Sequence, residues 1–222
     1  MNMKTIQDLI FDFDGTLADT APLIMATMQT TIHELQLPPR TDTECRATIG
    51  LRLEDVPAEL WPGDTVAENT FVAAYRRIFN RLKRPLSVEC FPGVLPTLGH
   101  LHRSGFRMAI ASSRSHASLD EYVDMLGIAH YFTMIVGGND VAEGKPSPEA
   151  VLKILDRCSW SADETLTIGD APVDILMGRS AGTATCAVTY GNGKESDLRS
   201  AAPTYITDNF PDIINFCSMS QS

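Results

Sequence analysis

The sequence lacks the features that mark membrane proteins and nucleic-acid-binding proteins. No apolar run approaches the roughly 20 residues that a transmembrane helix needs, and no signal-peptide pattern opens the chain. The 222 residues carry a net charge of −10, whereas a surface that neutralises nucleic-acid phosphates needs an excess of Lys and Arg. We therefore expect no membrane and no nucleic-acid partner. A small anionic ligand is still compatible with a site that is locally positive.

Cysteine is also scarce, and its arrangement argues against a disulfide framework. The five cysteines are odd in number, widely spaced and without a CxxC pair, so we expect free thiols and a cytoplasmic location. The five histidines show no metal-ligand spacing beyond His100-x-His102, which we assign to a helix surface. The length admits one large domain or a core with a smaller domain. We expect the protein to be a monomer.

Two carboxylates follow a short apolar run near the start of the chain. Residues 9–11 predict a buried strand, Asp12 and Asp14 follow it, and Gly15 and Thr16 break it. Buried carboxylates are costly unless they are paired, hydrogen-bonded or metal-bound. A polar turn would explain the pair taken alone, so its meaning depends on what later segments bring to it.

Between residues 18 and 87 the apolar pattern is that of helices. A stripe runs over residues 23–35, capping-box patterns begin at Thr41 and Thr65, and a long amphipathic helix follows the second box. We expect no strand in this stretch. We interpret residues 18–87 as a small all-helical domain inserted after the first strand.

Beyond Phe91-Pro92-Gly93 helices and short apolar strands alternate. Alternation of this kind predicts a parallel sheet with helices on both faces. The chain is therefore predicted to be α/β, with a core formed by residues 1–17 and 88–222. The expected strands cover residues 106–111, 132–136, 165–168 and 185–188, and the expected helices 94–103, 115–126 and 173–181, with another starting at Pro148.

Polar residues stand where the predicted strands end, which is where open parallel sheets bind ligands. The strand at 106–111 leads to Ser112, Ser113 and Arg114. The strand at 165–168 leads to Asp170, with Asp174 one helical turn later, and Lys145 lies between these segments. Singly, Ser112 or Asp170 could cap a helix and Lys145 could be solvated. Their conjunction with the first carboxylates predicts one shared site.

The residues of this predicted site suit phosphoryl transfer, which needs positioning and charge neutralisation more than elaborate covalent chemistry. Asp12, Asp14 and Asp170 would repel one another without a cation, and Mg²⁺ prefers oxygen ligands of this kind. Asp12 is the candidate nucleophile. Asp14 is the candidate acid and base for the leaving oxygen and the hydrolytic water.

The remaining candidates would bind and neutralise the phosphoryl group. Ser112 would donate a hydrogen bond to a phosphoryl oxygen, and Lys145, held by Asp174, would neutralise the developing charge. The main-chain amides of Gly15 and Ser113 would complete an oxyanion cradle. The predicted substrate-binding residues are Gly15, Thr16, Arg52, Ser113 and Arg114.

Four motifs resemble those of the haloacid dehalogenase-like hydrolases, in that family's order and spacing. The resemblance implies a Rossmann-like core with Asp12 as nucleophile and Asp14 as acid and base. It implies Mg²⁺ held by the Asp12 carboxylate, the Asp14 main-chain carbonyl and Asp170, with Asp174 counted among the metal-site residues. It also implies that the helical insertion is a C1 cap. The motifs are Phe11-Asp12-Phe13-Asp14-Gly15-Thr16-Leu17, Ser112, Gly144-Lys145-Pro146-Ser147-Pro148 and Gly169-Asp170-x-x-x-Asp174.

Within that family, Asp14 disfavours dehalogenation and the helix-end position of Lys83 disfavours phosphonate hydrolysis. Residues 48–53 and 188–191 resemble the phosphoglycolate phosphatase-like branch. We expect a Mg²⁺-dependent phosphatase that hydrolyses a small phosphomonoester, of phosphoglycolate type or a sugar phosphate, through an aspartyl-phosphate. A mutase resembling β-phosphoglucomutase, an inorganic pyrophosphatase and a non-catalytic phosphometabolite sensor stay open. Arg52 would contact the substrate from the cap, or it is an exposed arginine beside Glu54 and Asp55.

Overall fold

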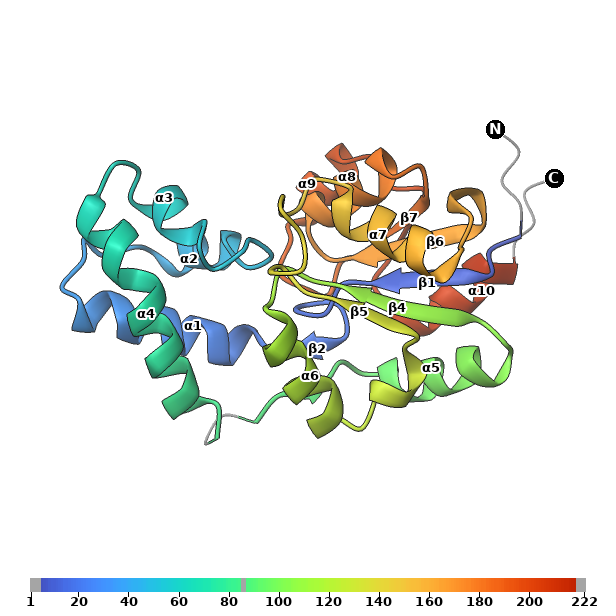
Figure 1. Cartoon of the computed structure of the whole chain (residues 1–222), viewed down its shortest axis with the longest axis horizontal. Coiled ribbons are helices and arrows are strands. Elements are labelled where there is room, and N and C mark those ends of the chain that lie inside the picture. Colours follow the sequence, from blue (N-terminus) through green and yellow to red (C-terminus); the bar gives the residue numbers. More distant parts are fainter. Residues whose placement is uncertain (1–4, 85–86, 219–222) are drawn as a thin grey trace.

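The computed structural model describes residues 5–84 and 87–218. Within them a six-stranded parallel sheet lies between helices, and a group of four helices stands beyond one end of it (Figure 1). This confirms the predicted α/β core with an all-helical insertion. The strand order is β5-β4-β1-β6-β7-β8, with β1 Asp8–Phe11, β4 Arg107–Ala111, β5 Met134–Val136, β6 Thr165–Gly169, β7 Ala184–Val188 and β8 Tyr205–Thr207.

Both faces of the sheet are covered, and nearly every residue of its central strands is buried. Side chains alternate between the faces along a strand. Leu9 and Phe11 pack with α5, α6 and α10, whereas Ile10 packs with α7 and α8. The core helices are α5 Val94–Arg103, α6 His116–Met125, α7 Glu149–Cys158, α8 Pro172–Ser180, α9 Glu195–Ser200 and α10 Ile213–Ser218, with short 3₁₀ helices at Ala129–Tyr131, Ala162–Glu164 and Phe210–Asp212.

The four helices beyond the sheet, called the cap below, pack around a hydrophobic cluster of their own that includes Met28, Trp61 and Phe71. The predicted capping box at Thr41 is present. The capping box predicted at Thr65 is wrong, because Asp64 is the N-cap of this helix. Its carboxylate accepts hydrogen bonds from the main-chain amides of Val66 and Ala67. The cap helices are α1 Ala21–Glu34, α2 Asp42–Ala47, α3 Val56–Leu60 and α4 Thr65–Leu82.

Two short strands join the cap to the core, so the expectation of no strand between residues 18 and 87 is wrong. β2 Ala18–Asp19 pairs antiparallel with β3 Glu89–Cys90, because the chain leaves and re-enters the core at the same place. Residues 85–86, at the predicted cap boundary, lie outside the described residues. Among the described helices, none has the length and apolar character to cross a membrane.

Candidate active site

The site lies at the carboxyl ends of the three central strands. β1 pairs with β4 on one side and β6 on the other, and Phe11 is in register with Ile110 and Ile168. Asp12 directly follows β1, and the loops that follow β4 and β6 begin beside it, with Ser112 and Asp170. Parallel pairing therefore brings together segments that are about 100 and 160 residues apart in sequence, as expected at the ligand edge of such a sheet.

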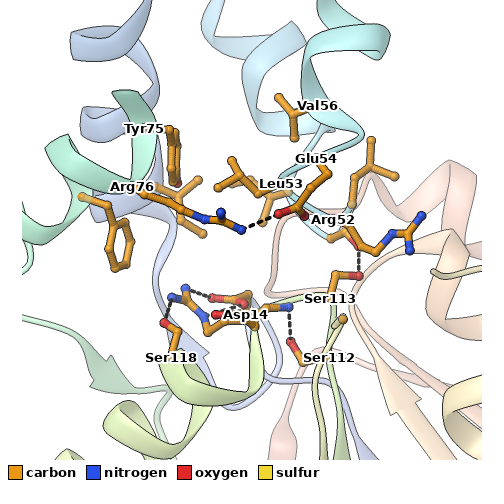
Figure 2. A pocket seen from close by; sticks show the side chains of 18 of the residues that line it. Asp14, Arg52, Leu53, Glu54, Val56, Tyr75, Arg76, Ser112, Ser113 and Ser118 are labelled. Atoms are coloured by element: carbon orange, nitrogen blue, oxygen red, sulfur yellow. Dashed lines mark hydrogen bonds and ion pairs between the residues drawn. The ribbon is translucent and has the colours of Figure 1, made fainter. Parts of the chain in front are cut away.

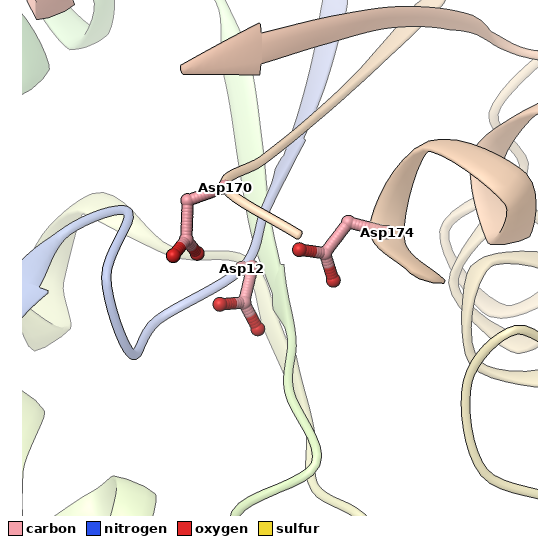
Figure 3. A group of neighbouring side chains, drawn as sticks. All are labelled: Asp12, Asp170 and Asp174. Carbon is pink, nitrogen blue, oxygen red and sulfur yellow. The ribbon is translucent and has the colours of Figure 1, made fainter. Parts of the chain in front are cut away.

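Three buried carboxylates and one ammonium form the centre of the site. One oxygen each from Asp12, Asp170 and Asp174 lies within 4.8 Å of the others (Figure 3). Lys145 Nζ donates to Asp12 Oδ1 at 2.5 Å and to Asp174 Oδ1 at 2.7 Å. When all four groups are ionised, two negative charges are left uncompensated. This net charge and the all-oxygen donor set fit a hard divalent cation.

The protonation of this cluster follows from burial and charge. Burial raises the pKa of Asp12 well above its usual range; Lys145 opposes this rise and Asp174 adds to it. Burial and the Asp174 carboxylate raise the pKa of Asp170 to about 7. Burial lowers the pKa of Lys145, but Asp12 and Asp174 outweigh it and raise the pKa above its usual value. A bound dication would favour the ionised carboxylates, because an opposite charge stabilises the charged form.

Asp170 is held in place by donors from two loops. Thr16 Oγ1 donates to its Oδ1 at 3.0 Å, and the main-chain amide of Asn192 donates to its Oδ2 at 2.7 Å. The Asn192 side chain adds a longer bond of 3.3 Å to the same oxygen. The Oδ1 atom of Asn192 accepts a hydrogen bond from Arg46 of the cap at 3.2 Å. Asn192 was not among the predicted site residues; the available signal was its place in Gly191-Asn192-Gly193, a loop that follows the β7 strand end.

The Asp14 carboxylate is turned away from the acidic cluster. Arg114 donates to both of its oxygens, at 2.5 Å and 3.1 Å, and Thr20 Oγ1 donates to Oδ1 at 2.6 Å. The residue-based expectation that the Asp14 side chain converges with Asp12 on a cation therefore differs from the structure, because the guanidinium and the hydroxyl hold the carboxylate elsewhere. A metal contact through its main-chain carbonyl stays a prediction.

Arg114 is enclosed by aromatic rings rather than presented to solvent. Its guanidinium carbon lies 4.9 Å from the Tyr122 ring centroid and 5.4 Å from that of Phe79, where cation–π attraction is favourable. Burial lowers the pKa of Arg114, but Asp14 outweighs it and raises the pKa. Arg114 was predicted to contact the substrate; in this structure it lines the cavity and holds Asp14.

The predicted phosphate-binding groups are divided between the cavity and the layer beneath it. Ser112 and Ser113 line the cavity. Ser112 Oγ accepts from the Arg114 amide at 3.2 Å, and Ser113 Oγ donates to the Gly50 carbonyl of the cap at 2.6 Å. The amide of Gly15 donates to the Ala18 carbonyl, closing a tight turn in which Gly15 has φ +90°. Gly15 and Thr16 are not among the residues that line the cavity, and their predicted contacts with the substrate stay predictions.

A cavity of about 590 Å³ separates the cap from this floor. Asp14 and Ser112 lie on the core side and cap residues form the opposite wall (Figure 2). Asp12 also lines the cavity. Arg52 lines the cavity, but its Nε donates to Asp55 at 2.9 Å and its Nη1 to the Ala142 carbonyl at 3.0 Å. The structure therefore shows the alternative ion-pair interpretation of Arg52, and a substrate contact by this residue stays a prediction.

Comparison with known proteins now identifies the family. The family model described as haloacid dehalogenase-like hydrolase matches residues 9–188. The chain therefore belongs to the haloacid dehalogenase-like hydrolases, and it is an enzyme. The predicted family resemblance, which covered nearly the whole chain, is confirmed.

Similar proteins span almost the full length of the chain. It is 33% identical to "Probable phosphatase IndB" from Dickeya dadantii (strain 3937), over 93% of this chain and 91% of the relative. It is 28% identical to a phosphoglycolate phosphatase from Salmonella paratyphi A, covering 96% and 92%. A hydrolase of the same family from Streptococcus pneumoniae has a similar structure, with a TM-score of 0.84 and 26% identity over 96% of this chain and 98% of that one.

Proposed function

We propose that this enzyme is a Mg²⁺-dependent phosphatase that hydrolyses a small phosphomonoester through an aspartyl-phosphate. The observation that carries the proposal is the buried Asp12 carboxylate, which lines the floor of a capped cavity and is held by Lys145 at 2.5 Å. The phosphatase names of the similar proteins support the same reaction class.

In the first step an Asp12 carboxylate oxygen bonds to phosphorus as the bond from phosphorus to the alcohol oxygen breaks. Asp14, acting as the general acid, gives a proton to the departing alkoxide. Ser112 donates to a phosphoryl oxygen, and Lys145 neutralises charge on Asp12 and on the transferring group. The product of this step is the free alcohol and a phosphorylated Asp12.

In the second step water attacks the same phosphorus and the bond to the Asp12 oxygen breaks. Asp14 takes the proton of the attacking water, which restores both carboxyl groups and releases inorganic phosphate. Mg²⁺, when bound by Asp12, Asp170 and the Asp14 carbonyl, with Asp174 beside them, supplies the positive charge that lets a carboxylate approach an anionic phosphate. The substrate is a small metabolite enclosed by residues 18–87 acting as the cap domain.

The proposal is tested with p-nitrophenyl phosphate in the presence and absence of Mg²⁺. Asp12→Asn removes the nucleophile, and we expect turnover to fall by at least about 10³-fold because no covalent intermediate can form. Asp156→Asn, at an exposed position on α7, is the matched control and should retain turnover. Undiminished turnover in Asp12→Asn would refute the nucleophile assignment.

A further inference from the structure

The positive charges around the cavity are already paired with carboxylates of the protein. Among the described residues, each Arg or Lys that lines the cavity has an acidic partner, and three of these partners, Asp14, Glu54 and Glu121, line the cavity as well. The pairs are Arg52 with Asp55 at 2.9 Å, Lys83 with Glu121 at 2.7 Å, Arg114 with Asp14 at 2.5 Å, and Arg76 with Glu54.

This pairing bears on the part of the substrate that is not the phosphate. A carboxylate or a second phosphate on the leaving group would meet no unpaired cation among these side chains. It would instead approach Glu54 and Glu121, whose charges oppose it. Lys145, which does not join these pairs, is engaged by Asp12 and Asp174 at the phosphoryl end of the site. The charge pattern therefore favours an uncharged leaving group.

Apolar side chains form part of the cap wall of the cavity, beside the charged Arg52, Glu54 and Arg76 (Figure 2). Aliphatic side chains come from α1, from the segment before α3 and from the first residue of α3, and two aromatic rings come from α4. A wall of this kind gains from contact with apolar surface and gains nothing from a short polar acid. The apolar residues of this wall include Ile24, Met28, Leu53, Val56, Tyr75 and Phe79.

The size of the cavity is that of a site with the cap docked on the core. Ser113 donates to the Gly50 carbonyl at 2.6 Å, and Lys83 pairs with Glu121 across the same gap at 2.7 Å. With these contacts in place the volume is about 590 Å³, within the range of about 300–1,000 Å³ that is typical of pockets for drug-sized ligands. A two-carbon phosphate would leave the apolar wall unfilled.

We propose that the physiological leaving group is an uncharged alcohol that carries a ring-sized apolar face and is esterified to a single phosphate. The inference rests on the proposed phosphatase function and narrows its substrate class. It predicts discrimination against 2-phosphoglycolate, pyrophosphate and bisphosphates, because each carries a second anionic group toward the paired cations and the acidic residues.

The test compares phosphate release from benzyl phosphate, ethyl phosphate and 2-phosphoglycolate at one Mg²⁺ concentration. All three release a primary alcohol, so their rates differ through the cavity rather than through the leaving oxygen. We expect kcat/KM for benzyl phosphate to exceed the other two by about 10-fold or more, the effect of burying an apolar ring. A value for 2-phosphoglycolate equal to or above that for benzyl phosphate would overturn the inference.

A charge variant tests the pairing argument in the same assay. Glu54→Gln leaves Arg76 unpaired beside the cavity, so kcat/KM for 2-phosphoglycolate should rise about 2- to 5-fold, the size of an exposed charge interaction. The kcat/KM for benzyl phosphate, which carries no second anionic group, should rise less than that for 2-phosphoglycolate. Glu34→Gln is the matched control. It removes the acidic partner of Arg77, which follows Arg76 on α4 but does not line the cavity.

The outcomes separate this inference from the phosphatase proposal. Release of phosphate that favours 2-phosphoglycolate overturns the substrate class and leaves the phosphatase intact. An equal rise with 2-phosphoglycolate in Glu54→Gln and Glu34→Gln overturns the pairing argument, since net charge alone would then explain it. No release from any of the esters, p-nitrophenyl phosphate included, refutes the phosphatase and the substrate class together.

Discussion

Both oxygens of the Asp170 carboxylate are held by donors from other loops, Thr16 on one side and Asn192 on the other. A carboxylate has about four acceptor positions, so these bonds orient Asp170 and still leave lone pairs for a cation. Residues that orient a metal ligand matter nearly as much as the ligand itself. Asn192 is therefore expected to set the metal affinity of the site without touching the phosphate.

Asn192→Ala removes the side-chain bond to Asp170 and the bond from Arg46. We expect a 10- to 100-fold weaker affinity for Mg²⁺, the usual cost of losing a residue that orients a ligand, with kcat at saturating Mg²⁺ much less affected. Affinity is measured twice, by the Mg²⁺ dependence of turnover and by thermal stabilisation with Mg²⁺ in the absence of substrate. The second measurement does not depend on catalysis.

The matched control for this prediction is Asn69→Ala on the exposed side of α4, where the side chain donates only to the Thr65 carbonyl of its own helix. It should leave the Mg²⁺ affinity unchanged. An Asn192→Ala variant with unaltered Mg²⁺ affinity in both measurements would show that the main-chain amide and Thr16 suffice to orient Asp170.

At the residue scale, position after a strand is what made the site predictable. Asp12, Lys145 and Asp170 were grouped because parallel strands end at one edge, and the structure brings them together. The role of Arg114 was not predictable in the same way. Its partner Asp14 is 100 residues distant, and only the packed rings around the guanidinium make that pairing favourable over solvent.

At the scale of single elements, the start of α4 shows that the N-cap residue of a helix can differ from the one that a sequence pattern predicts. Thr65 begins a Thr-x-x-Glu pattern, yet Asp64 is the N-cap and accepts from the amides of Val66 and Ala67 at 3.0 and 3.1 Å. A carboxylate at this position also interacts favourably with the positive end of the helix dipole.

Asp64→Ala is expected to lower the free energy of unfolding by about 1 kcal/mol, within the range of about 0.5–2 for loss of an N-cap. Thr65→Ala, at the first residue of the helix, should change it by less than about 0.5 kcal/mol. Urea unfolding followed by circular dichroism measures both. If Thr65→Ala were the more damaging substitution, the capping box would be the correct description of this helix start.

The elements with a long periodic pattern were predicted best, and some of the shortest ones, such as β2 and β8, were missed. The helix at 94–103 and the strand ending at Ala111 lie where the pattern places them. β5 begins at Met134 rather than residue 132, because Ala129–Tyr131 forms a 3₁₀ helix just before it. Strands of two or three residues, such as β2 and β8, exist only through their pairing partners and leave no periodic signal of their own.

At the scale of the whole molecule, cap and core are joined at the site itself. Arg46 of the cap contacts Asn192, which holds Asp170, and Gly50 of the cap accepts from Ser113. The position of the cap on the core is therefore linked, through Arg46 and Asn192, to the orientation of the buried Asp170 carboxylate. These carboxylates are also where the molecule carries uncompensated charge, so a cation bound there should stabilise the whole fold.

Mg²⁺ should raise the melting temperature, and the rise should grow as the pH increases from 5 to 8. Asp170 has its pKa raised from 3.8 to about 7 in the metal-free fold. Between these values the folded state holds more protons than the unfolded state, so the metal-free protein loses stability as pH rises through this window. Mg²⁺ binds the ionised carboxylates and offsets that loss. Differential scanning fluorimetry with EDTA or Mg²⁺ at each pH measures the difference. Asp170→Asn should reduce its pH dependence and leave the part that comes from Asp12, whose pKa is also raised by burial. A Mg²⁺-induced shift that is constant over this range would contradict the assignment of these carboxylates to the metal.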